Sequence, residues 1–212
     1  MTKAKDLVEY RVPLQHSDIC PNRIYKEKCL LDKRPVIYSK RNTNVAVCAA
    51  IFDSDGYLLL TRRFARMMFF PKAWVLPGGG VELHESLETS LIREVLEETG
   101  INITPLKKDP SKYQYNEKPC EVSPFYAFES CSYQSEEEPA KSTHLILFYQ
   151  VVIPQAHKDI PLWLQYTEVD KALWLHKSDL HKMLMSETGE EEKTMQGYEL
   201  VDKSGMVREC EI

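Results

Sequence analysis

Three carboxylates crowded near the end of one predicted helix are the residues of this chain best suited to chemistry. Glu94, Glu97 and Glu98 lie in the segment GGVELHESLETSLIREVLEETGI at 79–101, which starts with the last two glycines of the run 78–80. Neighbouring like charges on a helix repel each other, and a helix C-terminus disfavours anions. Clustered carboxylate oxygens are instead the ligands that Mg²⁺ and Mn²⁺ prefer. The spacing therefore predicts a divalent-cation site with a phosphate chain bound to the cation.

The glycine-rich turn Pro77-Gly78-Gly79-Gly80 ahead of these carboxylates predicts where the phosphates lie. A turn without side chains lets phosphates approach closely and can offer a carbonyl oxygen to the cation. The simplest reaction is then attack of a metal-activated water on phosphorus. A Glu-rich helix can also be a solvated face without function. The metal site is favoured because six residues occur together at fixed spacings behind the glycine run. They are Glu85, Arg93, Glu94, Glu97, Glu98 and Gly100.

A helix over about 85–99 must position these carboxylates. Its apolar residues recur at the i, i+4 and i+5 intervals of one buried stripe. The stripe contains Leu87, Leu91, Ile92, Val95 and Leu96. Ser86 or Glu85 lies near the helix start, and Gly100 fits a left-handed C-cap. The acidic arc borders Leu91 and lies opposite Ile92 and Leu96, so we expect the carboxylates beside the core.

The surrounding elements are mainly strands, with a hairpin-type turn at 53–56 and an irregular stretch at 103–123. Ser178 or Asp179 is expected to cap a helix that ends near residue 186. We predict an N-terminal extension with short strands at 1–43, a main domain at 44–186 and a C-terminal tail at 187–212, of which residues 187–193 are acidic and solvated. The predicted strands are 44–52, 57–62, 73–76, 124–131, 144–153 and 172–175.

The segment 79–101 resembles the Nudix box and matches it at every specified position. The resemblance implies the Nudix fold, an α/β/α sandwich around a mixed β-sheet. It also implies hydrolysis of a nucleoside diphosphate linked to another moiety. By this resemblance Glu94 and Glu98 are the principal Mg²⁺ ligands, with Mn²⁺ as a substitute. Glu97 is a further ligand or a water-positioning carboxylate.

The same resemblance gives roles to three more residues and leaves the general base open. It implies that Gly78 offers its backbone carbonyl to the metal, and that Glu85 and Arg93 form an ion pair that orients the box. Glu94 is an alternative general base, because Nudix enzymes differ in where the base lies. Glu168, in a loop ahead of the strand at 172–175, is another candidate base.

The segments 57–82, 124–153 and 168–175 are similar to the nucleoside diphosphate-linked moiety X motif 17 hydrolases. That subfamily is described as magnesium-dependent hydrolases of the mRNA cap, which release a methylated guanosine diphosphate. The resemblance implies a capped-RNA substrate. The alternatives are a small nucleotide conjugate (ADP-ribose, a dinucleoside polyphosphate, NADH or a coenzyme A type) and a catalytically silent nucleotide-binding module. The intact carboxylate set argues against the silent module.

Several residues outside the box have both a functional and a structural interpretation. Arg62, Arg63 and Arg66 could bind phosphates, because arginine recognises phosphate in a bidentate manner, or could be surface arginines at a strand end. Trp74 is expected to fill the core rather than to stack on a base. His144 opens an apolar strand and is expected to be structural.

The composition of the chain argues against several classes of protein. The 212 residues include 43% hydrophobic and 28% charged residues, as expected for a single globular domain. A net charge of -5 argues against a general nucleic-acid binder. None of the six cysteines forms a CxxC pair, which argues against zinc. The N-terminus lacks an apolar signal region, and no apolar run approaches the ~20 residues of a membrane span. These features predict a cytoplasmic or other intracellular protein and indicate no particular oligomeric state.

Overall fold

The computed structural model describes residues 14–16, 42–105, 119–132, 142–180, 196–201 and 203–211. The chain divides into two compact units, one made of 1–46 and 124–148 and the other of 47–123 and 149–212. All residues of the predicted carboxylate cluster belong to the second unit.

The sheet of the second unit is built around β3 (Tyr57–Arg63). This strand pairs antiparallel with β2 (Asn42–Phe52) on one side and with β9 (Val169–His176) on the other. Two short strands, β4 (Trp74–Val75) and β5 (Gly78–Gly80), pair with β3 and β2 respectively. The predicted strands at 44–52, 57–62 and 73–76 are confirmed, the last being shorter than expected.

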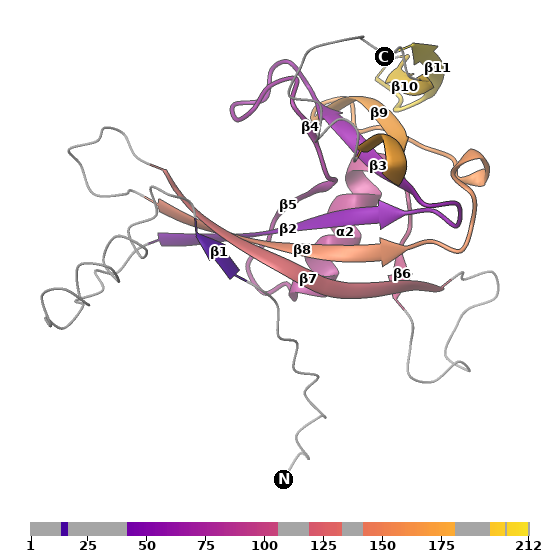
Figure 1. Cartoon of the computed structure of the whole chain (residues 1–212). Helices are drawn as coiled ribbons and strands as arrows, with labels where there is room; N and C mark the ends of the chain where they lie inside the picture. The colour runs from indigo at the N-terminus through magenta and orange to yellow at the C-terminus, as the bar shows by residue number, and fades with distance from the viewer. Residues whose placement is uncertain are drawn as a thin grey trace, which may run out of the picture. The chain divides into compact units, whose positions relative to one another are not determined.

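The helix α2 (Leu87–Thr99) lies beside β5 and follows it in the chain after the loop 81–86 (Figure 1). A second helix begins at residue 177 and is described as far as 180. Its first turn is capped by the ring of His176, whose Nδ1 accepts the Ser178 N–H at 3.3 Å. The predicted caps were Ser178 or Asp179, so the helix starts earlier than expected. No helix in the described ranges is long and apolar enough to cross a membrane.

Part of the C-terminal tail predicted for 187–212 forms strands. Strands β10 (Gln196–Leu200) and β11 (Val207–Glu211) form an antiparallel hairpin, and β10 extends the sheet beyond β9. Tyr198 lies opposite Ala172 in this pairing. Without the hairpin, β9 would be an edge strand with unpaired N–H and C=O groups. Residues 187–195, which carry the acidic run, lie outside the described ranges.

The stretch predicted to be irregular, 103–123, contains strand residues at both ends. β6 (Thr104–Pro105) pairs parallel with the start of β7 (Pro119–Ser132), so the prediction is wrong at these positions. β8 (Ser142–Val152) confirms the strand predicted at 144–153. Together with the antiparallel pairs, this parallel pair makes the mixed sheet and the α/β class that the sequence predicts.

The first unit contains one of the short strands expected in the N-terminal extension. β1 (Leu14–His16) pairs parallel with β7, and Leu14 lies opposite Ala127. His144 has a hydrogen-bond partner within the protein: its Nε2 lies 3.3 Å from the side-chain amide nitrogen of Asn44. Residues 133–141 lie outside the described ranges.

The predicted turn at 53–56 is built around the carboxylate of Asp53, which is 3% exposed. One oxygen accepts the N–H groups of Asp55 (3.0 Å) and Tyr57 (2.7 Å). The other accepts the backbone N–H (2.8 Å) and ring Nδ1 (2.7 Å) of His157. A single side chain therefore joins the β2–β3 turn to the 3₁₀ helix His157–Asp159.

Replacing Asp53 with alanine is expected to lower the free energy of unfolding by about 3 kcal/mol, because buried donors lose a charged acceptor. Burial alone would raise the pKa of Asp53, but hydrogen bonds from Tyr57, His157 and Asp55 outweigh it and lower the pKa. The stabilisation is therefore present above the unfolded pKa and is lost as pH falls through the folded one. Urea denaturation should show the gap between the variant and the wild type closing below about pH 4. Asp55→Ala, at an exposed position in the same turn, is the control, and equal stabilities of the two variants would contradict the assignment.

Candidate active site

Two glutamates share the buried face of α2 with its apolar residues. Leu91 and Val95 are fully buried, as predicted, whereas Leu96 is 45% exposed. Glu94 and Glu98 are only 9% and 3% exposed. The carboxylates therefore lie on the inner side of the helix, where they face the glycine turn.

Both helix ends are fixed by the caps expected from the sequence. The hydroxyl of Ser86 accepts the Thr89 N–H at 3.1 Å, which satisfies one free donor of the first turn. Gly100 has φ 74° and donates its N–H to the Leu96 carbonyl at 2.9 Å. These caps define where the helix begins and ends.

Arg93 joins the carboxylates of the box to one another. Its Nε and Nη2 donate to the two oxygens of Glu85, both at 2.9 Å, so the ion pair implied by the resemblance is present. Its Nη1 donates to Glu94 at 2.8 Å and to Glu97 at 3.2 Å, and its Nη2 reaches the Gly80 carbonyl at 3.0 Å. The hydrogen bonds from Arg93 lower the pKa of Glu85 to about 2. One guanidinium thus ties the loop ahead of α2, the helix and the glycine turn together.

Glu98 is the buried carboxylate whose negative charge is least compensated by hydrogen bonds and nearby cations. Burial raises its pKa to about 8, against a hydrogen bond from the Gly78 N–H at 3.0 Å. The negative charges of Glu94 and Glu168 raise it further, and Arg63 opposes them. Burial also raises the pKa of Glu94, although Arg93 counteracts it. A buried carboxylate beside two others is costly unless a cation is bound there.

Two of the three glycines in this turn, Gly78 and Gly79, have no space for a side chain. Gly78 has φ 150°, and a Cβ atom there would lie 2.1 Å from the Val47 carbonyl oxygen. A Cβ atom on Gly79 would lie 2.5 Å from the carboxyl carbon of Glu94. The turn is therefore packed against β2 on one side and against the box carboxylate on the other. That the Gly78 carbonyl serves as a metal ligand stays a prediction.

These residues fit a divalent cation. The donors are hard carboxylate oxygens, and buried Glu98 has no cationic hydrogen-bond partner among the described contacts. Within the described part of the chain, no three His, Cys, Asp or Glu side chains already converge as a finished metal site. Arg93 is hydrogen-bonded to one oxygen of Glu94 and to one oxygen of Glu97.

Glu168 comes to this cluster from a distant loop, as the sequence hypothesis required. Its charge raises the pKa values of Glu94 and Glu98, although burial contributes more to both. The loop is attached to the end of α2 by its backbone. Trp163 donates its N–H to the Thr99 carbonyl at 2.9 Å, and Gln165 donates to the Glu98 carbonyl at 3.3 Å.

The three upstream arginines have different environments. Arg62 is bound by both oxygens of Asp170 at 2.8 Å, so its guanidinium has a structural partner that the sequence did not indicate. Arg63 donates to the Phe69 carbonyl at 3.0 Å, and Arg66 is exposed. Arg63 and Arg66 therefore remain the candidates for binding phosphate. Trp74 is half-buried on β4, opposite Arg62.

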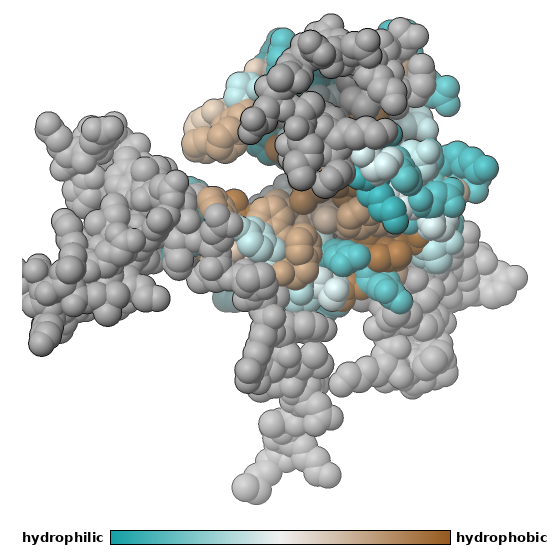
Figure 2. Space-filling view, viewed as in Figure 1, coloured by the Kyte–Doolittle hydropathy of each residue, from teal (hydrophilic) through white to brown (hydrophobic). Residues whose placement is uncertain are grey.

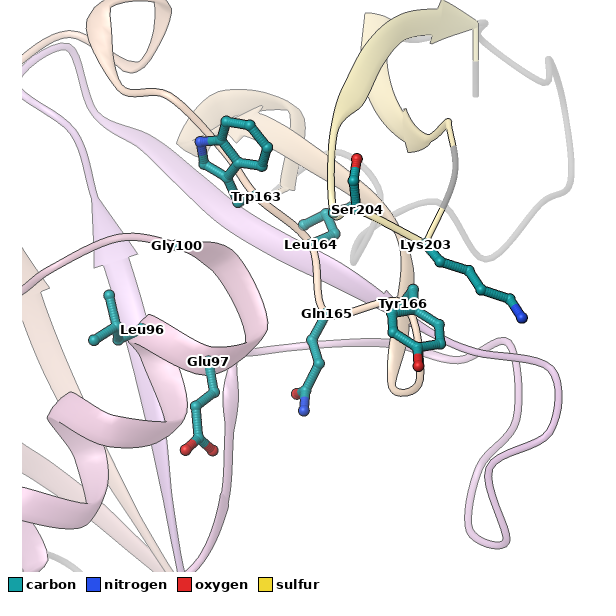
Figure 3. Close-up of a pocket in the computed structure, with 10 residues that line it drawn as sticks. Leu96, Glu97, Gly100, Trp163, Leu164, Gln165, Tyr166, Lys203 and Ser204 are labelled. Atoms are coloured by element: carbon teal, nitrogen blue, oxygen red, sulfur yellow. The ribbon is translucent and has the colours of Figure 1, made fainter.

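A pocket of about 280 Å³ opens beside the carboxylate cluster, at the C-terminal end of α2. Glu97, Gln165 and Tyr166 point toward the same side of it, whereas the Trp163 indole points the other way (Figure 3). Lys203, from the turn of the C-terminal hairpin, completes this side. This pocket could not be predicted from local sequence patterns, because its walls come from three distant segments.

The thiol of Cys48, on β2, is in an environment that disfavours its ionisation. Burial raises the pKa of its thiol to about 12, and the charges of Glu98 and Glu94 add to the effect. A thiol that stays protonated is a poor nucleophile.

The model of the NUDIX domain matches residues 42–186, more than half of the chain. The chain belongs to the Nudix family. A solved MutT protein from Methanosarcina mazei is 23% identical to this Nudix chain, with a TM-score of 0.45, and the match covers 71% of this chain and 87% of that one. The family assignment rests on the domain model rather than on this likeness.

The curated relatives match only part of the Nudix region. Over 94 residues, the chain is 38% identical to a Danio rerio protein named m7GpppN-mRNA hydrolase NUDT17, covering 44% of this chain and 31% of that protein. A Homo sapiens protein of the same name is 34% identical over 93 residues, covering 44% and 28%. Nucleoside triphosphatase NudI of Salmonella agona is 48% identical over 54 residues, covering 26% and 38%. The chain thus aligns with about a third of these relatives' own length.

Proposed function

We propose that this chain is a Mg²⁺-dependent Nudix hydrolase that cleaves a pyrophosphate bond in a nucleoside diphosphate linked to another moiety. The observation that carries the proposal is the pair of buried carboxylates, Glu94 and Glu98, facing a glycine turn. Mn²⁺ would suit the same oxygen donors. A catalytically silent module would have no need to keep Glu98 buried beside two other carboxylates.

In the proposed reaction, Glu94 and Glu98 hold the cation, and Glu97, which is 48% exposed at its side chain, faces the solvent side of the site. When bound, the cation supplies neutralisation of the diphosphate and a lowered pKa of water. Arg93 keeps the carboxylates in place through its bonds to Glu85 and to the Gly80 carbonyl. Glu168 and Glu94 remain the candidate general bases.

For the substrate we propose the 5′ cap of mRNA, with release of m7GDP. The support is the NUDT17 name shared by relatives that are 32–38% identical over this region. The pocket beside Glu97 is where the proposal places the nucleoside end, because the Tyr166 ring offers a stacking surface and Gln165 offers an amide. The match to NudI favours nucleoside triphosphates as a second candidate.

The test is a substrate panel with Mg²⁺ or Mn²⁺, resolved by product analysis. The panel contains capped RNA, a nucleoside triphosphate, ADP-ribose, a dinucleoside polyphosphate, NADH and coenzyme A. We expect capped RNA to give m7GDP in the presence of metal and no product with a chelator. Calorimetric titration with Mg²⁺ measures metal binding independently of the substrate. If only another conjugate is cleaved, that conjugate replaces the mRNA cap as the proposed substrate. Absence of both metal binding and turnover would overturn the proposal that the chain is a hydrolase.

A further inference from the structure

The loop between β3 and β4 exposes three consecutive large apolar side chains. Met68, Phe69 and Phe70 are 85%, 63% and 76% exposed. Figure 2 shows apolar atoms at the place where Figure 1 draws this loop, beside β4. Contiguous exposed apolar residues of this kind mark interaction sites more often than isolated ones do.

Backbone hydrogen bonds hold this loop in a fixed shape. The Phe69 carbonyl accepts from Arg63 Nε at 3.0 Å, and the Arg63 carbonyl accepts the Lys72 N–H at 3.1 Å. The Ala73 N–H donates to the Phe70 carbonyl at 3.2 Å. Phe70 and Lys72 have φ values of 50° and 60°, which residues with side chains rarely adopt. Such strain persists at sites where the surrounding structure presents a residue for a function.

The charge of the loop indicates an anionic partner. Between Gly56 and Val81 the sequence contains Arg62, Arg63, Arg66 and Lys72 and no acidic residue, although the chain as a whole has a net charge of -5. Arg62 is neutralised by Asp170. The remaining cations flank the exposed rings, and this combination suits a ligand with both negative charges and flat surfaces.

The base of the loop lies at the carboxylate site. The Phe64 N–H donates to the Glu168 carbonyl at 2.6 Å, and Arg63 lies opposite Val169 on β9. A partner bound along the loop would therefore run away from the place where the diphosphate is cleaved. An anionic membrane surface would also attract the loop, but it would not have to begin at the site.

We propose that this loop binds the single-stranded RNA of the capped substrate next to the cleaved linkage. Phe69 and Phe70 stack on bases, and Arg66 and Lys72 contact backbone phosphates. The proposal rests on the proposed function, since it assigns a place to the RNA body of the same substrate. It gives the loop a role separate from the carboxylates that hold the metal.

The test measures binding of a fluorescent, uncapped 5′-hydroxyl RNA of about 10 nucleotides to the full chain without metal. Phe69→Leu with Phe70→Leu keeps the apolar surface but removes the rings, and we expect at least a tenfold loss of affinity (about 1.4 kcal/mol). Phe69→Tyr with Phe70→Tyr should retain binding. Leu83→Ala removes an equally exposed apolar side chain (86%) from another loop and should change nothing. Arg66→Gln with Lys72→Gln should flatten the salt dependence.

Unchanged RNA affinity in the leucine variant would overturn the proposal. A second result would also overturn it: the wild type binds phosphatidylserine vesicles but no RNA, and the leucine variant still binds the vesicles. That combination would assign the loop to a membrane. The RNA probe lacks a cap, so its binding does not depend on the cleavage reaction. Loop-dependent RNA binding without any cap hydrolysis would therefore count against the proposed substrate alone.

Discussion

Glu98→Gln is expected to lower kcat by roughly 100-fold or more while leaving the fold intact. The side chain is buried and aimed at the glycine turn, and glutamine can still accept the Gly78 N–H through its amide oxygen. What the substitution removes is the negative charge that the proposed cation requires. Steady-state kinetics with saturating Mg²⁺ measure the effect on turnover.

Metal-free stability separates this loss from misfolding. Since burial raises the folded pKa of Glu98 to about 8, its ionised form destabilises the protein increasingly as pH rises from the unfolded value through 8. At pH 8 without metal, Glu98→Gln should therefore melt at or above the temperature of the wild type. Mg²⁺ should then raise the melting temperature of the wild type but not that of the variant.

Glu88→Gln provides the matched control, because Glu88 lies in the first turn of the same helix and is exposed. It should leave both turnover and the response to Mg²⁺ unchanged. Near-normal turnover of Glu98→Gln would remove the metal assignment.

Gly78→Ala is expected to lower the free energy of unfolding by about 3 kcal/mol or more. The added methyl group would lie 2.1 Å from the Val47 carbonyl oxygen and 2.7 Å from the Cα atom of Cys48, and both are backbone atoms that cannot turn aside. The φ of 150° adds strain for any side chain. Relief requires β5 to move away from β2, which also pulls the Gly78 N–H away from Glu98.

Gly80→Ala is the control two positions along the same strand, where a Cβ atom meets nothing within 4 Å. Urea denaturation of both variants and of the wild type measures the difference. Similar midpoints for the two alanine variants would contradict the packing argument. Mg²⁺ titration of the surviving folded protein should also show weaker binding for Gly78→Ala.

The box helix was predictable because its signals are local. The apolar spacing, Ser86 and Gly100 fix its limits to within two residues. Its buried face was predicted less well, since the hydrophobic pattern assumes that apolar residues mark the inside. Glu94 and Glu98 occupy that inside, and Leu96 is consequently turned partly to solvent. Functional sites are where such local rules are expected to fail.

The remaining errors come from contacts between distant parts of the sequence. The pair of Arg62 with Asp170 joins residues on β3 and β9, and no spacing rule connects them. The hairpin β10–β11 is stabilised by pairing with β9, so the sequence of 187–212 alone gave no sign of it. The pocket at the end of α2 also depends on distant segments, because Lys203, Gln165 and Glu97 all line it.

The loop at 163–165 is joined to the C-terminal end of α2 by main-chain donors at Trp163 and Gln165. An amide group at position 165 is available with any residue except proline, so this hydrogen bond to the helix does not depend on the side chain there. At Gln165, the bond to the helix and the contact with the neighbouring pocket are therefore made by different atoms. During divergence, positions 165 and 166 can change what the neighbouring pocket accepts while the geometry of the catalytic helix is inherited unchanged.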